Sequence, residues 1–275
     1  MATQRIQWNR RTGIFLLAAG LTLLMGCGGA PLQVTPIDPN ANPAELIGRL
    51  KQELAEARAE EQDVLSPTWF RKAEASLGAA QKELEQGGAP ADIREHIAKA
   101  QAELQQAGVV AIRCHDQLDE TIQSRNVARA AQAQQFAGDY AAAENNFLKL
   151  TQAMEEGDFQ YAREKRRAVA EQFRALELRA IAQAALGDIR RLLAEAEHTR
   201  VPQDAPKSYA QAKAALISAE AYISANRYDK AAIQQKADDA IHMAQRAIVI
   251  AQTSRKIEKM PPEEIINQVK ISALR

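Results

Sequence analysis

The apolar positions of this chain recur at helical spacing in three stretches that lie about 70 residues apart. Within each stretch they are separated alternately by three and four positions, which is typical of the buried face of one helix. The matching positions are Phe70, Ala73, Leu77, Ala80 and Leu84, then Tyr140, Ala143, Phe147, Leu150 and Met154, then Tyr209, Ala212, Leu216, Ala219 and Ile223. Because large residues match in register, the pattern indicates an internal repeat.

A turn and a second apolar stripe follow each of these stretches, so each repeat predicts a helical hairpin. The turns fall at residues 87–90, 157–159 and 226–228. The second stripe is spaced by 3, 4, 3 and 3 positions, and only Glu171 breaks its apolar pattern. Its positions are Ile97, Ala100, Leu104, Ala107 and Val110, then Ala168, Glu171, Ala175, Leu178 and Ile181, then Ala237, Ala240, Ala244, Ala247 and Ile250.

Each hairpin has a short arm of about 20 residues, or about 30 Å of helix, and a longer arm such as 91–137 or 158–199. The overhang of the long arm must pack against the next hairpin, because an apolar stripe left in water is unstable. Asn42-Pro43 reads as the start of a first helix that continues to residue 65, and Pro67 and Pro206 open later helices. The sequence therefore predicts an all-α fold, an elongated helical bundle or short solenoid of about three hairpin repeats of about 70 residues over 42–258, with a tail at 259–275.

The first 26 residues have the pattern of a secretory signal peptide. Arg5, Arg10 and Arg11 precede an uncharged apolar run at 14–26. This run is shorter than the roughly 20 apolar residues that cross a bilayer. We therefore expect residues 1–26 to be an export signal and not a membrane-spanning helix.

Leu24, Met25, Gly26 and Cys27 close this signal and resemble the lipobox of bacterial lipoproteins. The resemblance implies cleavage before Cys27, a diacylglyceride on its thiol and acylation of its new amino group. Residues 27–41 then form a flexible tether. Gly28 follows the cysteine in place of the Asp that retains Gram-negative lipoproteins in the inner membrane, so the resemblance implies the periplasmic face of the outer membrane. The alternative is an ordinary secretory signal in which a cysteine lies by chance.

The hairpin sequences resemble two helical families. Together with the lipobox, the Pro-x-x-Tyr-x-x-Ala pattern from Pro206 and its copy from Pro67 are similar to uncharacterised helical lipoproteins of the Gram-negative envelope. Their helical domain often precedes an OmpA-like peptidoglycan-binding domain, which we do not expect here after the tail. A weaker similarity, at residues 138–143, is to the corner of tetratricopeptide repeats. These resemblances imply a fold and a location, and no chemistry.

Charge and reactive residues favour a protein without enzymatic activity. Of the 35 Lys and Arg residues, three lie in the first 26, so 32 basic residues face 35 acidic ones in the remainder, a net charge of −3. No basic stripe is present, which argues against nucleic-acid binding. Cys114 and His115 point about 100° apart on a helix and cannot form a nucleophile–base pair. We expect no catalytic residues, no metal and no cofactor beyond the lipid on Cys27.

Two groups of residues are candidates for interactions. Trp69 lies at a helix start and is either core or a docking point for a partner. The basic cluster of Arg163, Lys165, Arg166 and Arg167 is either a solvated helix face or a contact with an acidic partner or anionic lipid. The acidic run at residues 56–63 is predicted to be a solvated helix face.

These features predict a lipid-anchored scaffold or adaptor for another envelope protein, since stacked helical repeats offer extended binding surfaces. One alternative is a structural spacer or a self-assembling rod, in which the helices pair between copies as a homo-oligomer. A second alternative is a carrier of an apolar ligand. An unpaired apolar stripe on the surface would favour the first two functions, whereas a closed apolar cavity would favour the carrier.

Overall fold

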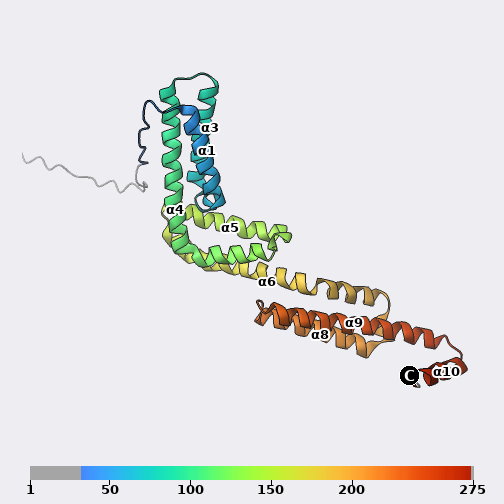
Figure 1. Cartoon of the computed structure of the whole chain (residues 1–275). Helices are drawn as coiled ribbons and strands as arrows, with labels where there is room; N and C mark the ends of the chain where they lie inside the picture. The colour runs from blue at the N-terminus through green and yellow to red at the C-terminus, as the bar shows by residue number, and fades with distance from the viewer. Residues whose placement is uncertain (1–31, 274–275) are drawn as a thin grey trace, which may run out of the picture. The chain divides into compact units, whose positions relative to one another are not determined.

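The structure, a computed structural model, describes residues 32–273, and every regular element in this part of the chain is helical (Figure 1). The all-α prediction is thus confirmed. None of these helices combines the length and apolar character needed to cross a membrane. The elements are α1 (Pro43–Ala59), α2 (Gln62–Leu65), α3 (Pro67–Glu85), α4 (Pro90–Ala130), η1 (Ala133–Gln135), α5 (Ala137–Glu156), α6 (Phe159–His198), α7 (Val201–Asp204), α8 (Pro206–Ala225), α9 (Lys230–Glu258) and α10 (Pro262–Ala273).

The helices build hydrophobic cores that each combine three helix segments. The first core joins α1, α3 and the first part of α4, and the second joins the rest of α4, α5 and the first part of α6. The third joins the rest of α6, α8 and α9. α3 packs against α4, α5 against α6 and α8 against α9, as the hairpin pattern predicts (Figure 1).

The two longest helices each belong to two cores. α4 contributes Ala107 to the first core and Val110 to the second, and α6 contributes Ala180 to the second and Leu186 to the third. Both helices run unbroken through these points. The expectation that a long arm packs against the neighbouring hairpin is therefore confirmed for α4 and α6.

Most of the predicted apolar stripes are buried, with one stripe in the wrong register. In the first stripes only Leu84 is exposed. In the returning arm of the second hairpin, the predicted Ala168, Glu171 and Ala175 are exposed. The residues buried there instead are Val169, Ala170, Phe173, Leu176, Glu177 and Ala180. This part of α6 packs against both α4 and α5, so its buried face is not the single stripe that the repeat predicts.

Three residues with a left-handed backbone conformation mark the corners between α1 and α3, between α4 and α5, and between α6 and α8. Glu61 (φ 60°), Gln132 (φ 62°) and Arg200 (φ 63°) each precede a single helical turn, which is α2, η1 or α7. The predictions that the first helix continues to residue 65 and that a long arm runs to 137 are wrong for this reason. A left-handed non-glycine residue costs on the order of 1 kcal/mol. Burial of Leu65, Ala133 and Val201 in the turns that follow offsets this cost.

The starts of the helices use different caps. Asn42 caps α1, since its Oδ1 accepts the Ala44 N–H at 3.0 Å. The start of α3 is capped from another helix, because the Glu155 carboxylate of α5 accepts the Ser66 hydroxyl at 2.7 Å and the backbone N–H groups of Thr68 and Trp69 at 3.0 Å. A carboxylate at a helix N-terminus is favourable, so this contact joins the first and second cores.

Part of the predicted tether is attached to the fold. Residues 32–42 form no helix, yet Ile37 and Ala41 pack against the first core. The signal peptide and Cys27 lie outside the described residues. Any stretch that separates the folded part from Cys27 therefore ends before Ile37.

Candidate functional site

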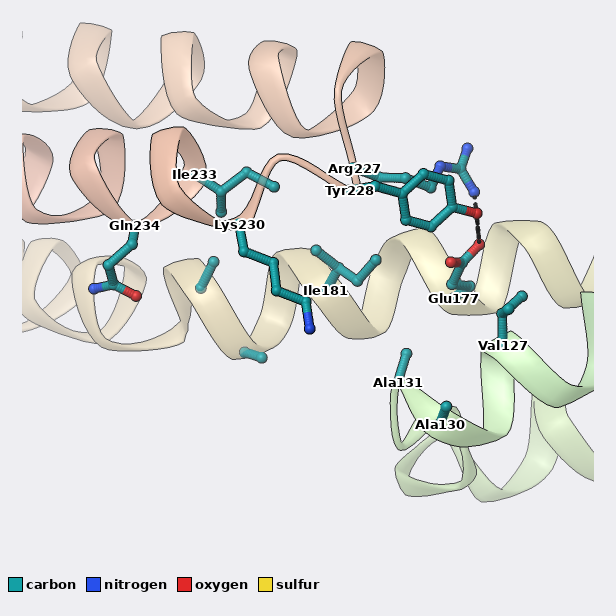
Figure 2. A pocket seen from close by; sticks show the side chains of 12 residues that line it. Val127, Ala130, Ala131, Glu177, Ile181, Arg227, Tyr228, Lys230, Ile233 and Gln234 are labelled. Atoms are coloured by element: carbon teal, nitrogen blue, oxygen red, sulfur yellow. Dashed lines mark hydrogen bonds and ion pairs between the residues drawn. The ribbon is translucent and has the colours of Figure 1, made fainter.

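An open cleft of about 560 Å³ lies where the second and third cores meet (Figure 2). The end of α4, the middle of α6, and the turn between α8 and α9 with the first residues of α9 surround it. We call it the junction cleft. Its lining residues are Val127, Ala130, Ala131, Glu177, Ile181, Ala184, Ala185, Arg227, Tyr228, Lys230, Ile233 and Gln234.

The floor of the junction cleft is apolar. α4 supplies Val127 and Ala130, and Ala131 follows α4 directly. α6 supplies Ile181 and two alanines, and α9 supplies Ile233. Alanine side chains fill little space, so the surface between the larger residues is hollow. Val127 is exposed, although it is a large apolar residue. Covering such a floor with another apolar group lowers the free energy, because apolar surface is removed from water.

A buried ion pair forms the polar wall of the cleft. Glu177 is almost fully buried, and its Oε2 lies 3.0 Å from Arg227 Nη1 and accepts the Tyr228 hydroxyl at 3.4 Å. Arg227 Nη1 also donates to the backbone oxygen of Arg174 at 3.1 Å. A buried carboxylate is costly unless it is paired. The pair therefore fixes the α8–α9 turn against α6.

Tyr228 projects from this wall. Most of its side chain is exposed, but partial burial of its hydroxyl and the negative charge of Glu177 raise the pKa of Tyr228. The phenol therefore stays neutral at physiological pH. Its aromatic ring lies at the edge of the junction cleft.

The turn itself is held by a helix cap. Asp229 Oδ1 accepts the Ala232 N–H at 3.1 Å, and its Oδ2 accepts the Tyr222 hydroxyl at 2.8 Å. These two hydrogen bonds lower the pKa of Asp229. Tyr228 and Lys230 flank Asp229 directly, so the cap fixes the backbone that carries both side chains.

Lys230 adds a positive charge to the cleft. Its side chain extends from the first turn of α9 across the floor toward α6 (Figure 2). Among residues 32–267, whose side chains the structure describes, Lys230 forms no ion pair, whereas the nearby Arg227 is paired with Glu177. Besides the paired Arg227, the junction cleft therefore offers an apolar floor, an aromatic edge and the cation of Lys230, which suits an apolar group that carries a carboxylate nearby.

The structure places the candidate interaction residues away from this cleft. Trp69 is half-buried, packs against both the first and second cores, and lies under Lys72 Nζ, which is 4.0 Å from its ring centroid. The basic cluster is exposed near the start of α6, where Arg166 Nη1 donates to the backbone oxygen of Gln117 at 2.6 Å. The lipobox residues Leu24, Met25 and Gly26 lie, like Cys27, outside the described residues.

The remaining reactive residues have structural contacts. The Cys114 thiol is buried and donates to the Leu65 backbone oxygen at 3.3 Å, while His115 is exposed. Glu61, from the acidic run, pairs with Arg125 and Arg129. In the part of the chain that the structure describes, no three His, Cys, Asp or Glu side chains are grouped to hold a metal ion.

Sequence reasoning did not single out the junction cleft. The sequence predicts only a turn at residues 226–228, although Tyr228 occupies the repeat position of Phe159. Phe159 packs against the second core, whereas Tyr228 is exposed. The exchange of Phe for Tyr gives no signal by itself, because Tyr209 replaces Phe70 in the same way and is buried.

No family model, no characterised protein and no solved structure matches this chain.

Proposed function

We propose that this chain is a lipid-anchored, non-enzymatic scaffold of the bacterial envelope that docks a partner protein in the junction cleft. The anchor is Cys27, and the location is the periplasmic face of the outer membrane. The observation that carries the docking proposal is the apolar, solvent-open cleft with a cation at its edge. The anchor rests on the lipobox pattern alone.

The cleft fits one side chain or one helix turn of a partner. Its apolar floor suits a large aliphatic or aromatic anchor, which is how helix-in-groove recognition obtains affinity. Lys230 suits a carboxylate placed beside that anchor. The partner we propose is therefore an amphipathic helix that carries a large apolar residue next to an acidic one.

The geometry favours docking over transport of an apolar ligand. A carrier shields its ligand from water, whereas the junction cleft opens to solvent. The helical cores themselves are filled by side chains such as Phe70, Phe147 and Phe173.

Site-specific photo-crosslinking in cells tests the docking proposal. A photoreactive amino acid at Val127 lies in the cleft, and the same amino acid at Ile112 is a matched control, since both residues are exposed on α4. We expect Val127 to crosslink to one envelope protein, and Ile112 to give no such product. Lys230→Glu should abolish the Val127 product by repelling the acidic residue of the partner. Equal labelling from both positions would show that the cleft does not dock a partner.

Fractionation of a Cys27→Ser variant tests the anchor independently. We expect this variant in the soluble periplasmic fraction and the parent chain in the outer membrane. If the variant stays with the membrane, the lipid anchor is wrong, whatever the crosslinking shows.

A further inference from the structure

α10 carries two adjacent isoleucines that the hydrophobic cores do not use. Ile266 is 57% exposed, and Ile265 is half-buried. Among the residues whose side chains the structure describes, neither isoleucine packs against any of the three cores. An apolar pair left uncovered on an amphipathic helix is typical of a helix that docks in a groove.

The first turn of α10 places acids beside this pair. Glu263 and Glu264 both lie in that turn. Glu263 is three residues before Ile266, and residues at this spacing are neighbours on one side of a helix. The nearest bases along the chain, Lys259 and Lys270, lie outside the turn. α10 thus combines a large apolar residue with an adjacent acid, which is the pattern that suits the junction cleft.

The charges of the junction cleft complement this pattern. Three of its lining residues are charged, namely Glu177, Arg227 and Lys230. Glu177 and Arg227 form an ion pair at 3.0 Å, so their charges largely cancel. The charge of Lys230 then dominates the cleft, and its side chain extends across the apolar floor (Figure 2). An isoleucine on that floor would bring a neighbouring glutamate close to a cation, which is favourable.

A chain cannot place α10 in its own junction cleft. Gln234, the cleft residue furthest along α9, lies 24 residues before the last residue of that helix, Glu258, which is about 36 Å of helix. From Glu258, four extended steps lead to Pro262 and four helical steps lead on to Ile266, and together they span at most about 20 Å. An α10 that docks in a junction cleft therefore belongs to a different copy.

We propose that α10 of one copy of this chain docks in the junction cleft of a second copy, with Ile266 on the apolar floor and Glu263 beside Lys230. This inference rests on the docking function proposed above and names the docked partner. The contact joins two different patches, which lie apart on the same chain. Each copy can therefore donate its α10 to one neighbour and accept the α10 of another.

Cysteine crosslinking between two differently tagged copies of the full chain, in isolated envelopes, tests this contact. One copy carries Ile266→Cys and the other carries Val127→Cys, while Cys114 stays buried. With a short thiol-specific crosslinker, we expect a mixed dimer in several-fold higher yield than from Ile266→Cys paired with Ile112→Cys. Ile112 is the matched control, because it is exposed on the same helix as Val127 but does not line the cleft. A chain that carries both Ile266→Cys and Val127→Cys should crosslink to other copies and not within itself.

Exchange of two charges tests the proposed orientation of α10. Glu263→Lys in the first copy should lower the yield of the mixed dimer several-fold, and so should Lys230→Glu in the second copy, because each brings like charges together. The two changes combined should restore the yield, since they exchange the charges of the pair. Circular dichroism of each variant verifies that the helices are intact.

Three outcomes would overturn the inference: equal yields from Val127→Cys and Ile112→Cys, a crosslink within one chain, or no recovery when the charges are exchanged. The docking proposal would survive that failure if photo-crosslinking from Val127 captures a different envelope protein. It would fail together with this inference if Val127 gives no product that Ile112 lacks.

Discussion

Removal of the Arg125 guanidinium should destabilise the fold strongly, because this cation joins α4 both to the corner at Glu61 and to α5. Arg125 lies on α4, and its side chain is only 7% exposed. Its Nε lies 2.9 Å from both carboxylate oxygens of Glu144 on α5, and its Nη1 lies 2.9 Å from Glu61. The guanidinium also sits 5.3 Å from the centroid of the Phe147 ring. Arg125→Met keeps much of the apolar length and removes the charge.

The expected loss in the free energy of unfolding depends on the two carboxylates, Glu61 and Glu144, that the substitution leaves without this cation. Loss of one partner from a buried ion pair costs about 3–5 kcal/mol, because the other charge stays buried. Glu61 and Glu144 are 26% and 21% exposed, and Glu61 keeps Arg129, so water and the second cation reduce the cost. We therefore expect the free energy of unfolding to fall by about 3 kcal/mol, which is the low end of this range. For a chain of this size that lowers the melting temperature by about 6–12 °C.

Urea unfolding followed by circular dichroism measures this effect. Arg191→Met is the control, since Arg191 pairs with the exposed acids Asp188 and Glu195 on its own helix, and its unfolding curve should match the parent. The double variant Arg125→Met/Glu144→Gln should recover part of the loss, because it removes one uncompensated carboxylate. A parent-like midpoint for Arg125→Met would refute the reasoning.

Three further predictions concern single groups. Burial alone would raise the pKa of Glu61, but hydrogen bonds and charges from Arg129 and Arg125 outweigh it and lower that pKa. The stability that Glu61 contributes is thus present above its unfolded pKa of about 4.3. In a pH series of unfolding curves, this stability should be lost as the pH falls below that value, and the loss should be smaller in Arg125→Met. Burial, with the charge of Glu155, raises the pKa of Cys114 to about 12, so a thiol reagent at pH 8 should label Cys114 only after urea unfolds the chain. Glu155→Gln should cost about 1–2 kcal/mol in the same unfolding assay, because it weakens the cap on the start of α3.

The helices and most of their buried faces could be predicted from the sequence. Phe70, Tyr140 and Tyr209 repeat in register, and helical spacing then selects which of their neighbours are buried. The register of the second returning arm could not be predicted, because alanine-rich sequence aligns with itself at several shifts. Phe173, a fully buried residue of that arm, is the better guide.

The corners and the junction cleft depend on contacts that sequence spacing does not show. Glu61 is left-handed without being glycine, and two arginines of α4 pair with its carboxylate at this corner. Glu177 and Arg227 are 50 residues apart, and they meet only because α6 passes from the second core to the third. Local propensity therefore predicts the helices, while long-range ion pairs fix the corners between them.

The packing of Ile37 and Ala41 on the first core shortens the chain that would connect the folded part to the proposed lipid on Cys27. If Cys27 is held at the lipid surface, only ten residue steps separate it from Ile37. A fully extended chain of that length spans at most about 36 Å. Residue Ile37 of a lipid-anchored copy would thus explore a thin layer beside the bilayer. Its movement would be confined mainly to two dimensions, which raises its local concentration for any partner held in the same layer.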